Sequence, residues 1–119
     1  MSATVTKEDA RSGVRLTVAE VEKRLPEAAV RSVKAFEHGT LLAKLYAPRG
    51  YDPQKPHTRD EVYIVVSGSG TFVAGQKRHP FGPGDLLFVP ANVAHRFEGF
   101  SDDLTLWVLF YGPEGGEAP

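Results

Sequence analysis

Apolar and polar residues alternate along most of the chain with the two-residue period of β-strands. After residue 28, short apolar runs are separated by groups of Gly, Pro, Asn, Asp and Ser residues, which are typical of turns. Many short strands joined by such turns predict an antiparallel β-sandwich or β-barrel. The predicted strands are 29–36, 41–46, 61–66, 71–74, 76–81, 86–90, 95–97 and 104–111.

One short segment near the N-terminus has helical periodicity instead. Thr17 and Glu20 form the capping-box pattern that opens a helix, and Pro26 ends it. The apolar residues between these points share one helical face. We therefore expect a short helix that lies on the outside of the β-structure.

Length and charge indicate one domain without a polyanionic partner. The 119 residues suffice for one hydrophobic core, which we assign to residues 16–112. Residues 1–15 and the Gly-rich residues 113–119 are expected to be flexible and unpacked. A formal net charge of -1 gives no reason to bind nucleic acid or anionic lipid. Without an apolar leader or a membrane-spanning stretch, a soluble cytoplasmic protein is expected.

The absence of cysteine narrows the possible chemistry. Disulfides and thiolate ligands are excluded, so a metal would have to be bound by nitrogen or oxygen donors. With a period of two, Glu61 and Tyr63 point to the same face of an otherwise apolar strand. A carboxylate on such a face needs water, a partner cation or a metal ion.

Two motifs resemble those of the cupin superfamily and occur in the family's order. In the first, three residues separate His57 from Glu61, and six separate Glu61 from Gly68. The second is GDLLFVPANVAH at residues 84–95, which ends in His95. The resemblance implies a small single-domain, RmlC-like jelly roll. Its fold would be all-β, an antiparallel double-stranded β-helix with one short N-terminal helix.

The chain departs from these motifs at a few positions. Asn92 replaces a usual glycine, a mild change because Asn tolerates a left-handed backbone, and Gly99 stands where asparagine usually ends the second motif. Lys55 replaces the first histidine of the His-x-His pattern. A protonated lysine cannot bind a metal. Either Lys55 extends to solvent, or the site is weakened and Gln54 or water takes that position.

The resemblance implies that His57, Glu61 and His95 bind one divalent transition metal in the barrel lumen. Two imidazoles and a carboxylate with open positions suit Fe, Mn, Ni, Co or Zn. Tyr63 resembles the tyrosine that follows the metal-binding glutamate by two residues in cupin-type lyases acting on dimethylsulfoniopropionate, where it acts as a base. The alternative is an aromatic residue that only shapes the pocket.

Other side chains complete the expected site. The residues expected to line the substrate pocket are Gln54, Lys55, Phe88, Phe97 and Trp107. The strand that carries Trp107 is also interpretable as core or as a dimer contact.

Three remaining polar residues are predicted to have no role at a metal. His38 falls in a predicted hairpin turn, and His79 lies outside both motifs, so both should be exposed. By alternation with Glu61, Asp60 should face outward.

Three functions remain open at this level. The first is a metal-dependent enzyme of dioxygenase, isomerase or lyase type that acts on a small organic molecule. The second is a non-catalytic module that binds an organic acid, a sugar or a phosphate near Lys55. The third is a structural relic of a metal enzyme, kept for dimerisation. Fold alone does not choose among them. Cupins often pair edge strands, so the resemblance also implies a homodimer.

Overall fold

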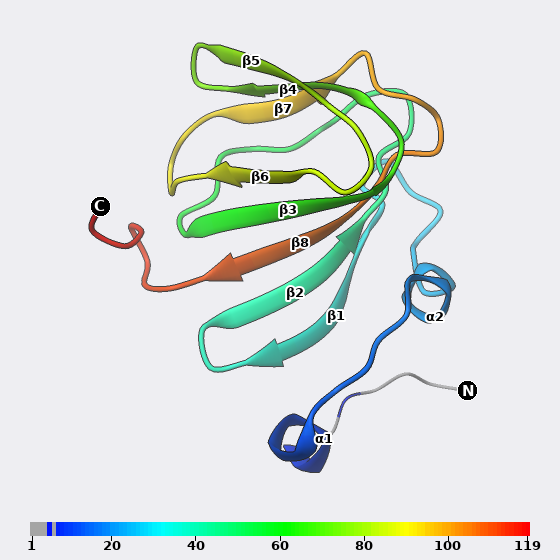
Figure 1. The fold of residues 1–119 in the computed structure, drawn as a ribbon, viewed down its shortest axis with the longest axis vertical. Helices are drawn as coiled ribbons and strands as arrows, with labels where there is room; N and C mark the ends of the chain where they lie inside the picture. Colours follow the sequence, from blue (N-terminus) through cyan, green and yellow to red (C-terminus); the bar gives the residue numbers. More distant parts are fainter. Residues whose placement is uncertain (1–4, 6) are drawn as a thin grey trace.

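In the described part of the chain, eight strands form two facing sheets, and two short helices lie beside the larger sheet (Figure 1). The structure is a computed structural model that describes residue 5 and residues 7–119. The helices are α1 (Lys7–Ser12) and α2 (Val18–Glu22). The strands are β1 (Ser32–His38), β2 (Leu41–Tyr46), β3 (Asp60–Ser67), β4 (Gly70–Ala74), β5 (Lys77–Phe81), β6 (Leu86–Val89), β7 (His95–Glu98) and β8 (Thr105–Tyr111).

The strand order is that of a jelly roll. The larger sheet has the order β1-β2-β8-β3-β6, and the smaller has the order β5-β4-β7. All neighbouring strands are antiparallel. The last strand, β8, lies between β2 and β3, so the end of the chain completes the middle of the larger sheet. The predicted all-β double-layered fold is confirmed.

The inner cluster is the hydrophobic core between the two sheets. Tyr63 on β3 makes edge contacts with Phe72 at 5.9 Å and with Phe97 at 5.0 Å between ring centroids, which join the sheets. Burial of each such ring contributes roughly 1.5–3 kcal/mol. The buried members are Tyr46, Tyr63, Val65, Phe72, Phe81, Leu87, Val89, Phe97, Leu104, Leu106, Val108 and Phe110.

The outer cluster is a smaller core under α2. It is formed by Val21 of α2 with Ala35 and Leu45, against which Trp107 packs. The predicted helix is confirmed, with the Thr17 hydroxyl accepting a hydrogen bond from the Glu20 N–H at 3.2 Å. Pattern reading missed α1, whose sequence KEDARS has no apolar face but consists mostly of good helix formers. Neither helix is long or apolar enough to span a membrane, which holds for the whole described part of the chain.

Two motif positions have plain backbone roles. A Cβ at Gly68 would lie 2.6 Å from the Cα of Leu104, so only glycine allows the two segments to approach this closely. Asn92 has a φ of 66°, the left-handed conformation expected at a position where the family usually has glycine. Gly68 therefore shapes the turn after β3, and Asn92 shapes the turn that leads to His95.

The C-terminal segment differs from the sequence expectation. Instead of remaining unpacked, it returns to the loop before β3, where the Gly115 N–H donates to the Thr58 carbonyl at 2.7 Å. The Glu117 N–H donates to an Asp60 carboxylate oxygen at 2.8 Å. Asp60, predicted to face outward, is only 4% exposed. Backbone hydrogen bonds from Glu117 and Ala91 lower the pKa of the Asp60 carboxyl, which explains how a buried carboxylate is tolerated here.

Candidate metal centre

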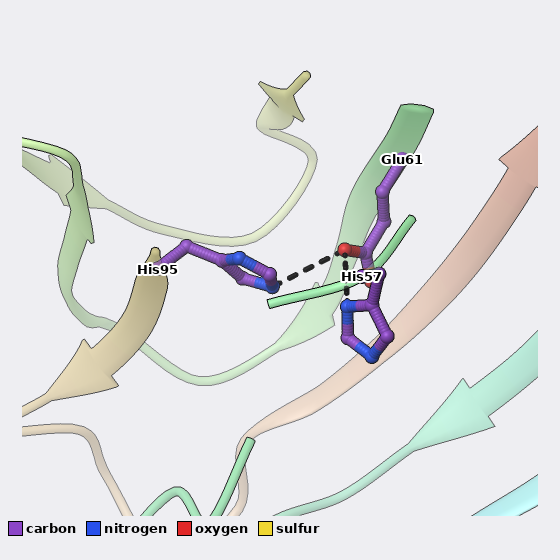
Figure 2. Close-up of side chains that lie close together, drawn as sticks. All are labelled: His57, Glu61 and His95. Atoms are coloured by element: carbon purple, nitrogen blue, oxygen red, sulfur yellow. Dashed lines mark ion pairs between the residues drawn. The ribbon is translucent and has the colours of Figure 1, made fainter. Parts of the chain in front are cut away.

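The structure brings together the three side chains that the sequence predicts as ligands (Figure 2). Glu61 lies near the start of β3, His95 begins β7, and His57 comes from the loop before β3. His57 Nδ1 lies 3.1 Å from Glu61 Oε1, and His95 Nε2 lies 3.2 Å from the same oxygen. One donor atom from each residue lies within 4.8 Å of the others. These atoms therefore share a common point.

Strand pairing and one loop contact hold this geometry. Glu61 pairs with Phe110 of β8 on one side and with Val89 of β6 on the other. Its side chain is 1% exposed. The loop that carries His57 is joined to the turn before His95 by a hydrogen bond from the Asn92 N–H to the His57 carbonyl at 2.6 Å. Two distant parts of the sequence are thus fixed against each other at the site.

A backbone hydrogen bond defines the tautomer of His95. Its Nδ1 lies 2.9 Å from the Val93 carbonyl oxygen, which can only accept, so Nδ1 carries a proton. In the neutral ring, Nε2 then presents a lone pair toward Glu61 Oε1. Two acceptors facing each other at 3.2 Å require a proton or a cation between them.

The buried polar atoms without a hydrogen-bond partner also indicate a cation at this point. His57 Nδ1, both carboxylate oxygens of Glu61 and His95 Nε2 are buried without a hydrogen bond of good geometry. Among the residues that the structure describes, only Arg24 Nε shares this state. Buried polar atoms are normally hydrogen-bonded, and four exceptions at one point need an explanation. Two nitrogens and a carboxylate fit a divalent transition metal.

Electrostatics keep the carboxylate ionised. Burial acts to raise the pKa of Glu61, but the interactions with His57 and His95 outweigh it and lower the pKa to about 2. For His95, burial acts to lower the pKa, but the Glu61 carboxylate and the Val93 carbonyl raise it overall. At neutral pH the site thus holds a negative charge that attracts a proton or a metal ion.

Tyr63 belongs to a hydrogen-bonded chain beside these residues. It is fully buried, and its hydroxyl donates to Gln54 Oε1 at 2.7 Å. Burial, together with the Glu61 charge, raises the pKa of Tyr63 well above its usual range, so the phenol stays protonated. The Gln54 amide then donates to Asp52 at 2.9 Å. Asp52 also accepts from the Phe97 N–H at 2.8 Å and from the Tyr46 hydroxyl.

Sequence reasoning missed Asp52 and Tyr46. Tyr46 ends β2, and its inward direction follows from alternation with its neighbours. Asp52 lies in the loop between β2 and β3, where no periodicity indicates direction. No signal in a single sequence marks Asp52 as the acceptor that ties this loop to β7.

A cavity of about 220 Å³ opens beside the ligands and contacts His57 and Glu61. Gln54 and Lys55, two of the residues expected at the substrate pocket, line this cavity, and Lys55 is exposed. The Gln54 amide oxygen already accepts the Tyr63 hydroxyl proton, and no second histidine stands at position 55. The described residues therefore offer three ligands at this point.

The other three residues expected in the pocket do not line this cavity. Phe97 is 2% exposed within the inner cluster. Phe88 is 49% exposed on β6, where it pairs with Val62, and Trp107 pairs with Ile64 and packs in the outer cluster. Val62 and Ile64 alternate with the inward-facing residues of β3, so their cross-strand partners also point outward. His38 and His79 are exposed, as expected.

Comparison with known proteins identifies the family. Residues 44–111 match the family model of the cupin domain. Over 63 residues, the chain is 46% identical to an uncharacterized protein of Streptomyces coelicolor, covering 53% of this chain and 60% of that protein. It is 41% identical over 54 residues to acireductone dioxygenase of Bacillus velezensis, covering 41% of this chain and 30% of that enzyme. The chain thus spans less than two thirds of these relatives.

A solved structure supports the same fold. A Cupin 2 conserved barrel domain protein from Salinispora arenicola superposes with a TM-score of 0.64 at 17% identity, covering 84% of this chain and 88% of that chain. At this identity the likeness concerns the fold alone. The match over residues 44–111, which contain all three candidate ligands, shows that the chain belongs to the cupin domain family.

Proposed function

We propose that this protein is a metal-dependent cupin enzyme that acts on a small organic molecule in the cavity beside His57, Glu61 and His95. The observation that carries the proposal is the cluster of four buried, unsatisfied donor atoms at one point. Buried donors of this kind face one another only when a proton or a metal cation lies between them, and two imidazoles with a carboxylate are a set that a divalent metal prefers. A dioxygenase-type reaction is the first candidate, because acireductone dioxygenases are among the relatives.

The metal would be held by His57 Nδ1, a Glu61 oxygen and His95 Nε2. When bound, a divalent transition metal would supply Lewis acidity and, if it is redox-active, electron transfer. Glu61 would partly neutralise the cation. His95 is held by Val93 with Nε2 free to donate its lone pair. The inner cluster excludes water on the His95 side, while the half-exposed His57 leaves access from the cavity.

Tyr63 is proposed to assist at the end of the substrate that would face the metal. Its raised pKa keeps the proton on the phenol, and the hydrogen bond to Gln54 leaves the oxygen lone pairs available to accept. In this arrangement Tyr63 accepts a hydrogen bond or holds a proton in place. It is not a free base in the absence of a bound cation. Lys55 leaves the fourth ligand position to solvent or substrate.

Metal analysis tests the proposal. Protein purified without chelator is expected to contain close to one equivalent of Fe, Mn, Ni, Co or Zn, measured by elemental analysis. His95→Ala is expected to lose most of it, whereas the control His79→Ala, at an exposed histidine of β5, should retain it. If metal-free protein reconstituted with each of these ions binds none, the proposal is wrong. Oxygen uptake with an acireductone then tests the reaction type.

One observation favours a second candidate, a binding module without catalysis. Lys55 replaces a histidine of the motif and is exposed at the cavity. A module of this kind would be stabilised by small acids whether or not metal is present. Thermal-shift measurements with and without metal distinguish the two, because the enzyme hypothesis requires the shift to depend on the metal.

A further inference from the structure

Lys44 on β2 faces the interior of the barrel. Leu42 and Tyr46, two positions before and after it, both pack against the inner cluster. The residue opposite Lys44 on β8 is Val108, which is 4% exposed in the same cluster. The intervening Leu45 belongs to the outer cluster. Because side chains alternate along a strand, Lys44 extends from the inner face of the sheet.

This inward lysine has no carboxylate partner. The ion pairs among the described residues involve other side chains, and none includes Lys44. Lys34, directly opposite on β1, is instead paired with Glu37 at 2.7 Å. An ammonium on an inner face without a counter-charge is unfavourable unless water or an anion meets it. Lys44 is partly exposed, so water solvates its ammonium, and no ion pair with an acidic side chain of the described residues neutralises it.

Lys44 lines the same cavity as the candidate ligands. It contacts the cavity of about 220 Å³ together with Glu61 and Lys55. It also lines a neighbouring hollow of about 270 Å³ with His57 and Arg59. Among the described residues, Glu61 is the only acidic one that lines either space, and its charge is already directed at the two histidines. The entrance therefore has a positive potential that favours anions.

We infer that Lys44 is the residue that binds the negatively charged end of the substrate, and that the substrate is a small carboxylate. The inference rests on the proposed function for the position of the reacting end, which lies at His57, Glu61 and His95. One ammonium matches the single charge of a carboxylate. The apolar wall formed by Val108 and Phe110 fits the short carbon chain between the two ends.

The size of the cavity limits the substrate further. Its volume of about 220 Å³ is below the ~300–1,000 Å³ of typical ligand pockets. Register places Lys44, Val108 and Tyr63 on one row across β2, β8 and β3. Two strand spacings separate the lysine backbone from β3, roughly 10 Å. A molecule of a few carbons, with oxygen donors at one end and a carboxylate at the other, spans this gap together with the lysine side chain.

Two matched hydroxamates test the inference in protein loaded with zinc, which is redox-inert. Both carry the chelating hydroxamate at one end of a four-carbon chain, and the other end is a carboxylate in succinic monohydroxamate and an amide in its analogue. Calorimetry is expected to show at least about tenfold tighter binding of the carboxylate, ~1.4 kcal/mol. Lys44→Met should remove this preference and leave the zinc content unchanged.

The controls separate the alternatives. Lys77→Met, at an exposed lysine on β5 in the other sheet, should keep the preference. The melting temperature of Lys44→Met should not fall, because the substitution removes an uncompensated ammonium. If Lys44→Met keeps the preference, or Lys55→Met alone removes it, the inference is wrong. If the wild type binds none of the five ions, the proposed function fails. Tighter binding of succinate than of succinamide by the metal-free wild type, lost in Lys44→Met, would then still support the role of Lys44, and equal binding would overturn it.

Discussion

Acidification of the metal-free protein is expected to remove stability that depends on Glu61. The pKa of this carboxyl falls from an ordinary 4.5 to about 2 in the folded protein. With ~1.36 kcal/mol for each pH unit, the ionised carboxylate stabilises the fold by about 3 kcal/mol. The side chain is 1% exposed, so solvent screening reduces this little. Against a typical total of ~5–15 kcal/mol, the effect is large.

The sign and the pH window follow from the direction of the shift. A depressed folded pKa means that the stabilisation is complete above pH 4.5 and is lost as the pH falls toward 2. By pH 3, about 2 kcal/mol of it should be gone. His95 has the opposite effect. Its pKa is raised in the folded protein, so the stability that it contributes is lost as the pH rises above that pKa. Metal-free protein should therefore be most stable in the mildly acidic range.

Urea denaturation between pH 3 and pH 8 measures this profile in chelator-treated protein. Asp60, whose pKa is also lowered, will still cause some fall in Glu61→Gln, but this variant should lack the part due to Glu61, about 2 kcal/mol at pH 3. Glu37→Gln, at an exposed carboxylate, should keep it. If the wild-type and Glu61→Gln curves fall in parallel, Glu61 is not held ionised by the two histidines, and the electrostatic account of the site is refuted.

Three further substitutions test individual contacts. Gly68→Ala should lower the free energy of unfolding by ~2 kcal/mol or more, because the new Cβ meets the Leu104 backbone and the residue has a φ of 92°. Chemical denaturation measures this change, and an unchanged midpoint would contradict the close approach of Gly68 and Leu104. Asp60→Ala leaves two backbone N–H groups without an acceptor and should cost ~1–3 kcal/mol, with faster hydrogen exchange near residue 117 as the readout. Tyr63→Phe removes the hydrogen bond to Gln54 and should cost about 1 kcal/mol without changing metal content; loss of metal would instead make Tyr63 a ligand.

The sequence predicted the parts of the site that regular structure determines. Glu61 and Tyr63 share a face because strands have a period of two, and β3 follows that rule from Glu61 to Val65. The same rule, applied across strands, would have excluded Phe88 and Trp107 from the cavity. That step needs the register of β6 and β8 against β3, and a single sequence does not give register between strands so far apart.

Loop geometry was beyond the reach of the sequence. The carboxylate of Asp52 accepts the Phe97 N–H from a strand 45 positions later, a contact that no local pattern encodes. The C-terminal segment was expected to be unpacked because its composition is poor in apolar residues. It nevertheless packs by backbone hydrogen bonds to Thr58 and Asp60, which composition does not reveal. The homodimer implied by the family resemblance stays a prediction.

Membership of the cupin family does not identify the substrate, because strands that lie outside the two motifs also line the cavity. Glu61 lies on β3 between β6 and β8, and His95 pairs with Ala74 of β4, so strand pairing fixes the direction of both donors. Lys44 lies on β2, outside both motifs, and its inward direction follows only from the pairing of β2 with β8. A substitution there changes the charge of the cavity without disturbing the donors. Specificity in this fold is therefore expected to vary on β2 while the metal chemistry stays constant.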